Sequence, residues 1–322
     1  MARQTDYWKK RLALEDDDTI RQIEEAVLER GIEDETHDGL IHISDKVDDI
    51  QRTYDSWGKV NGLRTGLPSL DEKIKGMGKG HVILVGGETS NGKSALVANI
   101  AVNVAKTDPV LFITLEMTTE EIGTRIMHIN GGTVDGLNMI FQQEHRLTYK
   151  DLKPLIQKAM QMQGIKLIVL DYLQYLGRGM TEKEVAIMSK EIKTLALEFD
   201  IPFMVVVSLR KSEGGRNKRK WTEIEIEDYM GTGAIGYDCD VAMIASRKDL
   251  SNEFDNDHMY VKMLKTRNAP LDYNDRYLTF KWDRTKITED WTKPEKPRYN
   301  PDEFSSAKEA GDQIVLAPTP FD

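Results

Sequence analysis

The sequence has little cysteine and no long apolar run, and both absences exclude classes of protein. One cysteine, Cys239, among 322 residues excludes an internal disulfide framework and a zinc site built from several thiolates. No apolar stretch is as long as a membrane span, and the charged start of the chain lacks the apolar core of a secretory signal. We therefore expect a cytoplasmic protein with no membrane partner, in which Cys239 is a buried structural thiol.

A surplus of basic residues is also lacking. The formal net charge is -10, which argues against indiscriminate coating of nucleic acid but leaves room for a local basic patch. Hydrophobic residues make up 39% of the chain, so it can bury a large core in one big domain or in two ordinary ones. Composition alone leaves the function open.

From about residue 62 to residue 288, short apolar runs alternate with segments of helical periodicity. The apolar runs predict strands buried on both faces, and they read HVILVGG, PVLFITLE, KLIVLDYLQ, PFMVVVSL, DVAMIAS and MYVKMLKTR. The helical segments read KSALVANIAVNVAK, TTEEIGTRIMHIN, YKDLKPLIQKAMQMQ and EVAIMSKEIKTLALEF. This alternation predicts an α/β fold with a largely parallel sheet flanked by helices.

We expect three parts in the chain: a helical extension and linker over 1–59, an α/β domain over 60–290, and a flexible acidic tail over 291–322. In the extension, one amphipathic helix ends at Gly31. A second helix follows Ser44 as its N-cap, with Val47, Ile50 and Tyr54 at helical spacing. Whether these helices pack on their own domain or on a neighbouring subunit stays open at this stage.

A glycine-rich stretch, GGETSNGKS, joins the first apolar run to the next helix. Its spacing matches the phosphate-binding P-loop pattern, and the required strand before it and helix after it are both predicted. Backbone N–H groups of such a loop bind phosphate oxygens, Lys93 would reach the outer phosphates, and the Ser94 hydroxyl would bind magnesium. The predicted nucleotide-binding residues are Gly87, Thr89, Ser90, Asn91, Gly92, Lys93, Ser94 and Ala95.

Two carboxylates follow apolar strands whose ends lie at the edge of the sheet where ligands collect. Asp171, at the end of KLIVLD, is the predicted second magnesium ligand, against the alternative of a plain turn residue. Glu116, after VLFITL, is predicted to orient or deprotonate the attacking water. The alternative for Glu116 is a carboxylate that stabilises the start of the next helix, a role for which Thr118 is better placed.

The ordered motifs of this chain resemble the ATPase domain of the DnaB family of ring-shaped replicative helicases. The resemblance spans about residues 40 to 285 and lies in GLRTGLPSLDEKIKGMGKGHVILVGGETSNGKS, FITLEM, LIVLDYLQYL, EVAIMSKEIKTLALEFDIPFMVV, GTGAIGYDCDVAMIASR and VKMLKTRN. It implies a RecA-like P-loop NTPase fold, a hexamer, and ATP-driven movement on single-stranded DNA in a bacterial or phage-infected cytoplasm. The large N-terminal domain of the family is not expected here.

Carried onto this sequence, the resemblance keeps the roles of Lys93, Ser94, Glu116 and Asp171. It implies that Arg267 is an arginine finger that reaches the ATP of the adjacent subunit, with Lys265 beside it. From the residues alone, the stretch KTR would be interpreted as a solvated strand end. The resemblance also implies DNA phosphate contacts from the backbone amides of Gly231, Thr232 and Gly233.

Two positions depart from the family pattern. Ser208 occupies the place of a glutamine or histidine that senses phosphate, and Met230 occupies the place of an arginine. A basic stretch, LRKSEGGRNKRKW, offers charge to replace that arginine, since a flexible basic loop neutralises phosphates without recognising bases. A solvated charge run is the alternative. The candidate DNA-binding side chains are Arg216, Lys218, Arg219 and Lys220.

The leading hypothesis is therefore an ATP-dependent replicative DNA helicase that uses ATP and Mg²⁺ and works as a hexamer on single-stranded DNA. A RecA-type recombinase filament and an ATP-gated ring scaffold for replication proteins are the alternatives, and Ser208 and Met230 keep the scaffold open. Expected further partners are a primase, a helicase loader, a polymerase or a single-strand-binding protein. Phe321 in the tail is a candidate anchor for one of them.

Overall fold

The computed structural model describes residues 42–56, 58–142, 147–171, 173–176, 181–209, 220–229, 233–272 and 275–290. The chain divides into two compact units, Met1–Asp55 and Ser56–Asp322, which are described separately below. The predicted helix that ends at Gly31 and the predicted tail over 291–322 lie outside the described residues.

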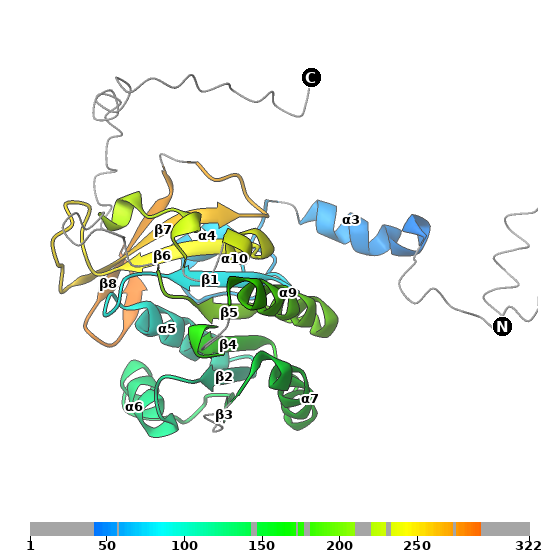
Figure 1. The fold of residues 1–322 in the computed structure, drawn as a ribbon, viewed down its shortest axis with the longest axis horizontal. Helices are drawn as coiled ribbons and strands as arrows, with labels where there is room; N and C mark the ends of the chain where they lie inside the picture. Colours follow the sequence, from blue (N-terminus) through cyan, green and yellow to red (C-terminus); the bar gives the residue numbers. More distant parts are fainter. Residues whose placement is uncertain are drawn as a thin grey trace, which may run out of the picture. The chain divides into compact units, whose positions relative to one another are not determined.

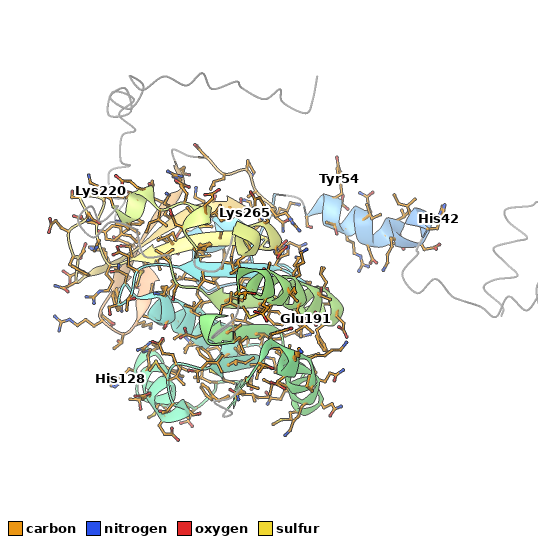
Figure 2. The ribbon with its side chains drawn as sticks, viewed as in Figure 1. His42, Tyr54, His128, Glu191, Lys220 and Lys265 are labelled. Carbon is orange, nitrogen blue, oxygen red and sulfur yellow. The ribbon has the colours of Figure 1, made fainter. Side chains whose placement is uncertain are left out.

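In the first unit, a short 3-10 helix, η1 (Ile43–Lys46), runs into α3 (Val47–Asp55). The prediction that Ser44 is the N-cap was wrong. His42 takes that place, because its Nδ1 accepts the backbone N–H of Ser44 at 3.3 Å, and the helical segment therefore begins one residue before Ser44. The helical periodicity was correct, and Tyr54 (Figure 2) and the other apolar side chains of this segment are exposed within the unit.

The second unit contains one sheet of nine strands among its described residues, in the order β3-β2-β4-β5-β1-β6-β7-β8-β9. The first six strands in this order are parallel, and β7, β8 and β9 continue the sheet antiparallel. In chain order they are β1 (Val82–Gly86), β2 (Val110–Thr114), β3 (Met139–Gln142), β4 (Leu167–Asp171), β5 (Phe203–Val206), β6 (Val241–Ser246), β7 (His258–Thr266), β8 (Tyr277–Trp282) and β9 (Ile287–Glu289).

Helices cover both faces of this sheet, as Figure 1 shows. One core packs beneath α5 and α6, and the other packs beneath α7 and α9. The α-helices are α4 (Pro68–Ile74), α5 (Lys93–Ala105), α6 (Thr119–Ile129), α7 (Leu152–Met162), α8 (Leu173–Leu176), α9 (Glu182–Phe199) and α10 (Gly233–Asp238). The 3-10 helices of this unit are η2 (Tyr149–Asp151), η3 (Trp221–Glu223) and η4 (Ile226–Asp228).

The prediction of a largely parallel sheet flanked by helices is confirmed, and each of the six predicted apolar runs contains a strand. β1, β2, β4, β5 and β6 are buried along their whole length, because the two apolar cores cover both of their faces. Cys239 is buried, as expected. Within the described ranges, no helix is long and apolar enough to cross a membrane.

The direction of the strands defines two edges of the sheet. We call the edge at which β1, β2, β4, β5 and β6 end the carboxyl edge, and the opposite one the amino edge. Because β7 is antiparallel to β6, β7 ends at the amino edge. Residues that follow β1 and residues that follow β7 therefore lie at opposite edges.

Candidate nucleotide-binding site

The P-loop stretch occupies the carboxyl edge, between β1 and α5, as the sequence predicts. Gly92 is the N-cap of α5 and has φ 87°, a left-handed conformation that favours glycine. α5 is almost wholly buried, so it fixes the loop firmly against the sheet. The first turn of a helix carries N–H groups without intrahelical partners, and these groups and the helix dipole attract anions.

Lys93 is turned inward onto its own loop. Its Nζ donates to the carbonyl oxygens of Gly87, at 3.0 Å, and Glu88, at 2.9 Å. Burial lowers the pKa of the Lys93 ammonium, and the charges of Asp171, Glu116 and Glu88 act in the opposite direction. Carbonyl oxygens here hold the ammonium where phosphate oxygens would bind it in a nucleotide complex.

Asp171 ends β4 and is buried, and it hydrogen-bonds with Ser94 at the start of α5. Burial raises the pKa of its carboxyl to about 6, although the Ser94 hydrogen bond lowers it. Asp171 Oδ1 is buried and has no hydrogen-bond partner among the described residues. A buried carboxylate oxygen without a partner, beside a hydroxyl, is the kind of oxygen donor set that Mg²⁺ prefers, so these residues fit the metal.

Glu116 lies two residues beyond the end of β2 and is exposed at the carboxyl edge. The start of the next helix is stabilised without it. Thr118 Oγ1 accepts the backbone N–H of Glu121 at 3.2 Å, and Glu121 Oε2 accepts that of Thr118 at 2.8 Å. Because Thr118 and Glu121 already form the capping box of α6, the carboxylate of Glu116 is available to a ligand.

These residues line one cavity of about 620 Å³ at the carboxyl edge. Its floor is the P-loop and the start of α5, and its walls come from α6 and from the turn between β8 and β9. The predicted residues that line it are Thr89, Ser90, Gly92, Lys93, Ser94, Ala95, Glu116, Asp171 and Ser208. The cavity thus brings the phosphate-binding loop, the predicted magnesium ligands and the candidate catalytic carboxylate together.

Several residues of this cavity were not predicted from the sequence. Arg125 and His128 (Figure 2) project from α6, Trp282 ends β8, and Arg284 lies in the β8–β9 turn. The positive charge of Arg125 lowers the pKa of Asp171. Helical spacing could have pointed to the α6 side chains, but only the tertiary fold brings the β8–β9 turn to this place.

An ion pair attached to the P-loop was also not predicted. Lys248 Nζ lies 2.8 Å from Glu88 Oε2, and Asn91 Nδ2 donates to the same oxygen at 3.0 Å. Lys248 follows β6, the neighbour of β1 in the sheet. The pair ties the first half of the loop to the next strand.

Arg267 and Lys265 lie at the amino edge and do not line the cavity of their own chain. An Arg267 guanidinium nitrogen is 2.7 Å from Asp240 Oδ1 in an ion pair that lacks hydrogen-bond geometry, and Arg267 stays half-exposed. Lys265 Nζ donates to the carbonyl oxygens of Gly236 and Tyr237, at 2.9 and 3.0 Å, at the end of α10. Both cations can therefore act on a nucleotide only if it belongs to another copy of the chain.

Asp240 itself is buried at the amino edge, where it anchors three elements. Its Oδ2 accepts the backbone N–H of Val82 at 2.8 Å and Lys193 Nζ at 2.7 Å. With Arg267 on the other oxygen, the carboxylate ties together the start of β1, α9 and the end of β7.

Most of the predicted DNA-binding residues cannot be placed. Lys220, labelled in Figure 2, is exposed at the start of η3, and Gly233 begins α10. The others lie outside the described residues, as does Met230: Arg216, Lys218, Arg219, Gly231 and Thr232.

A family model of the DnaB-like helicase C terminal domain matches residues 62–136 and 130–289. The chain belongs to this family. The match covers the P-loop, both carboxylates and the strand that carries Lys265, so the resemblance seen in the motifs is confirmed. Membership of this family implies nucleotide binding, and the cavity at the carboxyl edge is the candidate site for it.

Relatives of the DnaB-like domain are replicative helicases. The chain is 26% identical over 258 residues to replicative DNA helicase DnaB of Geobacillus stearothermophilus, a match that covers 70% of this chain and 56% of the relative. It is 25% identical over 257 residues to replicative DNA helicase DnaC of Bacillus subtilis (strain 168), with the same coverage. The chain therefore spans about half the length of these relatives.

Solved structures confirm the RecA-like fold of the DnaB-like domain. One solved ATPase domain superposes with a TM-score of 0.67 at 16% identity, covering 77% of this chain and 98% of that one. A KaiC-like protein from Pyrococcus horikoshii superposes with a TM-score of 0.53 at 18% identity, covering 70% of this chain and 97% of that one. At these identities the likeness supports the fold alone.

Proposed function

We propose that this chain is an ATP-dependent replicative DNA helicase that works as a hexameric ring on single-stranded DNA. The observation that supports this proposal most is the shared cavity of Lys93, Ser94, Asp171 and Glu116 in a chain of the DnaB-like family. Relatives named replicative DNA helicases support the same activity. The protein would work in the cytoplasm of a bacterium or of a phage-infected host.

At the carboxyl edge, the residues of the P-loop would bind the phosphates of ATP. Lys93 would exchange its two carbonyl partners for phosphate oxygens, and Ser94 and Asp171 would hold Mg²⁺. Mg²⁺ bound there would neutralise charge on the phosphates. Glu116, exposed in the same cavity, would orient and deprotonate the attacking water.

Arg267 would act in trans, with Lys265 beside it. Its position at the amino edge, opposite its own P-loop, supports a role on the nucleotide of an adjacent copy. An arginine delivered across an interface stabilises charge that develops in the transition state. Each active site would then be shared by two subunits.

The exposed apolar side chains of α3 support a role in assembly. Ile43 of η1 and Val47, Ile50 and Tyr54 of α3 are exposed, and no residue of these two helices is buried. We expect this helix to pack on a neighbouring subunit and hold the ring together. Removal of residues 1–58 should reduce the number of subunits in the oligomer, obtained from its native mass and the mass of the shortened chain, and an unchanged number would contradict this role.

DNA would lie against the basic stretch that contains Arg216, Lys218, Arg219 and Lys220, and against the backbone amides of 231–233. Contacts of this kind are made to phosphates, so binding should be tolerant of sequence and sensitive to salt. One solved structure, at a TM-score of 0.65 and 17% identity, is that of a DnaB-like replicative helicase and its interactions with primase. A primase is accordingly one candidate partner here, together with a loader, a polymerase or a single-strand-binding protein.

The decisive experiment compares ATP hydrolysis with and without single-stranded DNA. We expect DNA to stimulate hydrolysis, and Lys93→Ala to reduce it at least ~100-fold because the phosphates lose their charged donor. Lys106→Ala, at the other end of α5, is the matched control and should leave the rate unchanged. A correctly assembled Lys93→Ala protein that still unwinds a forked duplex would exclude the proposal.

Ser208 favours a second function. It lies in the wall of the cavity where the resemblance implies a longer, phosphate-sensing side chain. A ring scaffold gated by ATP would need no strong link between hydrolysis and DNA. Slow hydrolysis that DNA does not change would favour the scaffold, and open filaments on DNA in electron micrographs would favour a recombinase.

A further inference from the structure

Tyr229 is a fully buried tyrosine at the end of a described segment that lies between two predicted DNA-binding stretches. The basic stretch follows Leu209 in the chain, and residues 230–233 follow Tyr229. Leu209 and Tyr229 pair with each other in an antiparallel bridge. The starting points of both stretches are therefore joined at this residue.

The ring of Tyr229 also lies directly on the strand that leads into the P-loop. A Cβ placed on Gly86, the last residue of β1, would be 2.1 Å from Cε1 of Tyr229, so only glycine permits this contact. The hydroxyl of Tyr229 donates to the carbonyl oxygen of Met243 on β6, the strand beside β1, at 2.9 Å. Gly87, the first residue of the P-loop, follows at once.

The beginning of the same segment, residues 220–229, is held by hydrogen bonds to β7 and to the residues after β6. The buried Lys262 on β7 donates to the carbonyl oxygens of Thr222, at 2.8 Å, and Ile224, at 2.6 Å. Trp221 Nε1 donates to the carbonyl oxygen of Asp249 at 2.7 Å. The first half of residues 220–229 is fixed in this way. A displacement at 230–233 can therefore pass to the rest of the domain mainly through Tyr229, because close-packed interiors transmit strain.

We propose that Tyr229 is a positioning residue that couples the DNA-binding stretches to the P-loop through its contact with Gly86. This inference rests on the proposed function and gives it a physical route. DNA bound at the stretches biases the position of the tyrosine ring, and the ring biases the backbone of Gly86 and Gly87, which carry the loop that holds phosphate. The route does not need a long side chain at Ser208.

The test measures the ratio of ATP hydrolysis rates with and without single-stranded DNA in Tyr229→Leu. We expect this ratio to fall at least about fivefold, while the rate without DNA and the KM for ATP without DNA stay within about twofold of the parent. Phe280→Leu is the matched control, since it also removes a buried aromatic ring but lies in the other core, on β8. An unchanged ratio in Tyr229→Leu, or an equal fall in Phe280→Leu, would overturn the coupling role.

A second pair of variants keeps the test valid if Tyr229→Leu folds poorly. Gly86→Ala places a methyl group against the ring and should also lower the ratio, and combining it with Tyr229→Leu should lower the ratio no further than Tyr229→Leu alone, because both changes break the same contact. A ratio that Gly86→Ala leaves unchanged, or a double variant in which the two losses multiply, would overturn the proposal. Absence of stimulation in the unsubstituted protein would instead contradict the proposed function itself.

Discussion

The two edges of the sheet differ in how the charge of a buried carboxylate is paired. At the carboxyl edge, Asn91 Oδ1 and Asp171 Oδ1 are buried without hydrogen-bond partners among the described residues. At the amino edge, Asp240 Oδ1 also lacks a hydrogen bond among the described residues, but it lies 2.7 Å from an Arg267 guanidinium nitrogen, and Oδ2 accepts the backbone N–H of Val82 and Lys193 Nζ. The difference is one of charge pairing: Asp240 has two cations in contact, whereas no ion pair is seen for Asp171 among the described residues. We call the amino edge the satisfied edge for this reason, and we expect the carboxyl edge to receive its missing partners from a ligand.

Arg267 is the strongest challenge to this comparison, because it lies at the satisfied edge and is proposed to act on a ligand. We expect Arg267→Ala to lower ATP hydrolysis by ~10³ without changing ATP affinity, since an arginine finger stabilises the transition state. Lys79→Ala removes an exposed cation near the same edge and should have no such effect. Mixtures of Arg267→Ala and Lys93→Ala subunits should regain activity if the site is shared, and mixtures as inactive as either variant would contradict trans action.

Asp240→Asn tests the satisfied edge directly. The amide keeps an acceptor for Val82 but removes the charge that faces Lys193 and Arg267, so we expect the free energy of unfolding to fall by about 3 kcal/mol. Urea denaturation measures this change. Asp200→Asn, which breaks an exposed ion pair with Lys79, is the control and should change stability by less than about 1 kcal/mol.

Asp171→Asn should instead increase the free energy of unfolding, by about 1 to 3 kcal/mol in buffer without metal or nucleotide. Burial raises the pKa of the Asp171 carboxyl from 3.8 to about 6, so the folded state loses stability as pH rises between these values and the carboxyl becomes charged. The extra stability of Asp171→Asn over the parent should therefore be absent near pH 4 and reach its full value above about pH 6. A variant less stable than the parent at pH 7.5 would show that the carboxylate supports the fold.

Thr118→Ala should have the smallest effect on stability. Compared with Glu116→Gln, it distinguishes a residue that stabilises the fold from a nearby residue that acts on the ligand. Loss of the N-cap of α6 should cost about 1 kcal/mol in the free energy of unfolding, and Thr118→Ser should restore it because the hydroxyl returns. Glu116→Gln should leave stability unchanged and abolish hydrolysis. Equal losses of stability in Glu116→Gln and Thr118→Ala would show that Glu116 also supports the fold.

Five of the six strands that the sequence revealed are buried along their whole length, since a continuous apolar run needs no tertiary information; β7, the sixth, is partly buried. β3, β8 and β9 were not predicted. They lie toward the ends of the sheet, and partly buried residues such as Tyr277 and Thr279 alternate with buried ones along β8. Partial burial leaves a mixed pattern that composition and periodicity resolve poorly.

The residues of the candidate site also fall into a group that the sequence predicts and a group that it does not. The P-loop and Asp171 were predictable, because each is joined in sequence to the strand that positions it. Arg284 and Trp282 of the cavity, and Lys248, which pairs with Glu88 of the P-loop, come from distant parts of the chain, and nothing in their local sequence points to the P-loop. His42 replaced Ser44 as a helix cap because an imidazole nitrogen also accepts hydrogen bonds, which side-chain preferences for caps underrate.

The reversal of β7 has a consequence for symmetry. If the cation after β7 serves a nucleotide held after β1, the donor and acceptor surfaces of one copy lie on opposite edges of its sheet and cannot meet by a twofold rotation. Copies must then join head to tail, and such a contact repeats in one sense around or along the assembly. A strand of nucleic acid has a chemical direction, and every subunit of that assembly would bind it in the same orientation. Movement along the strand would then have one direction set by the structure.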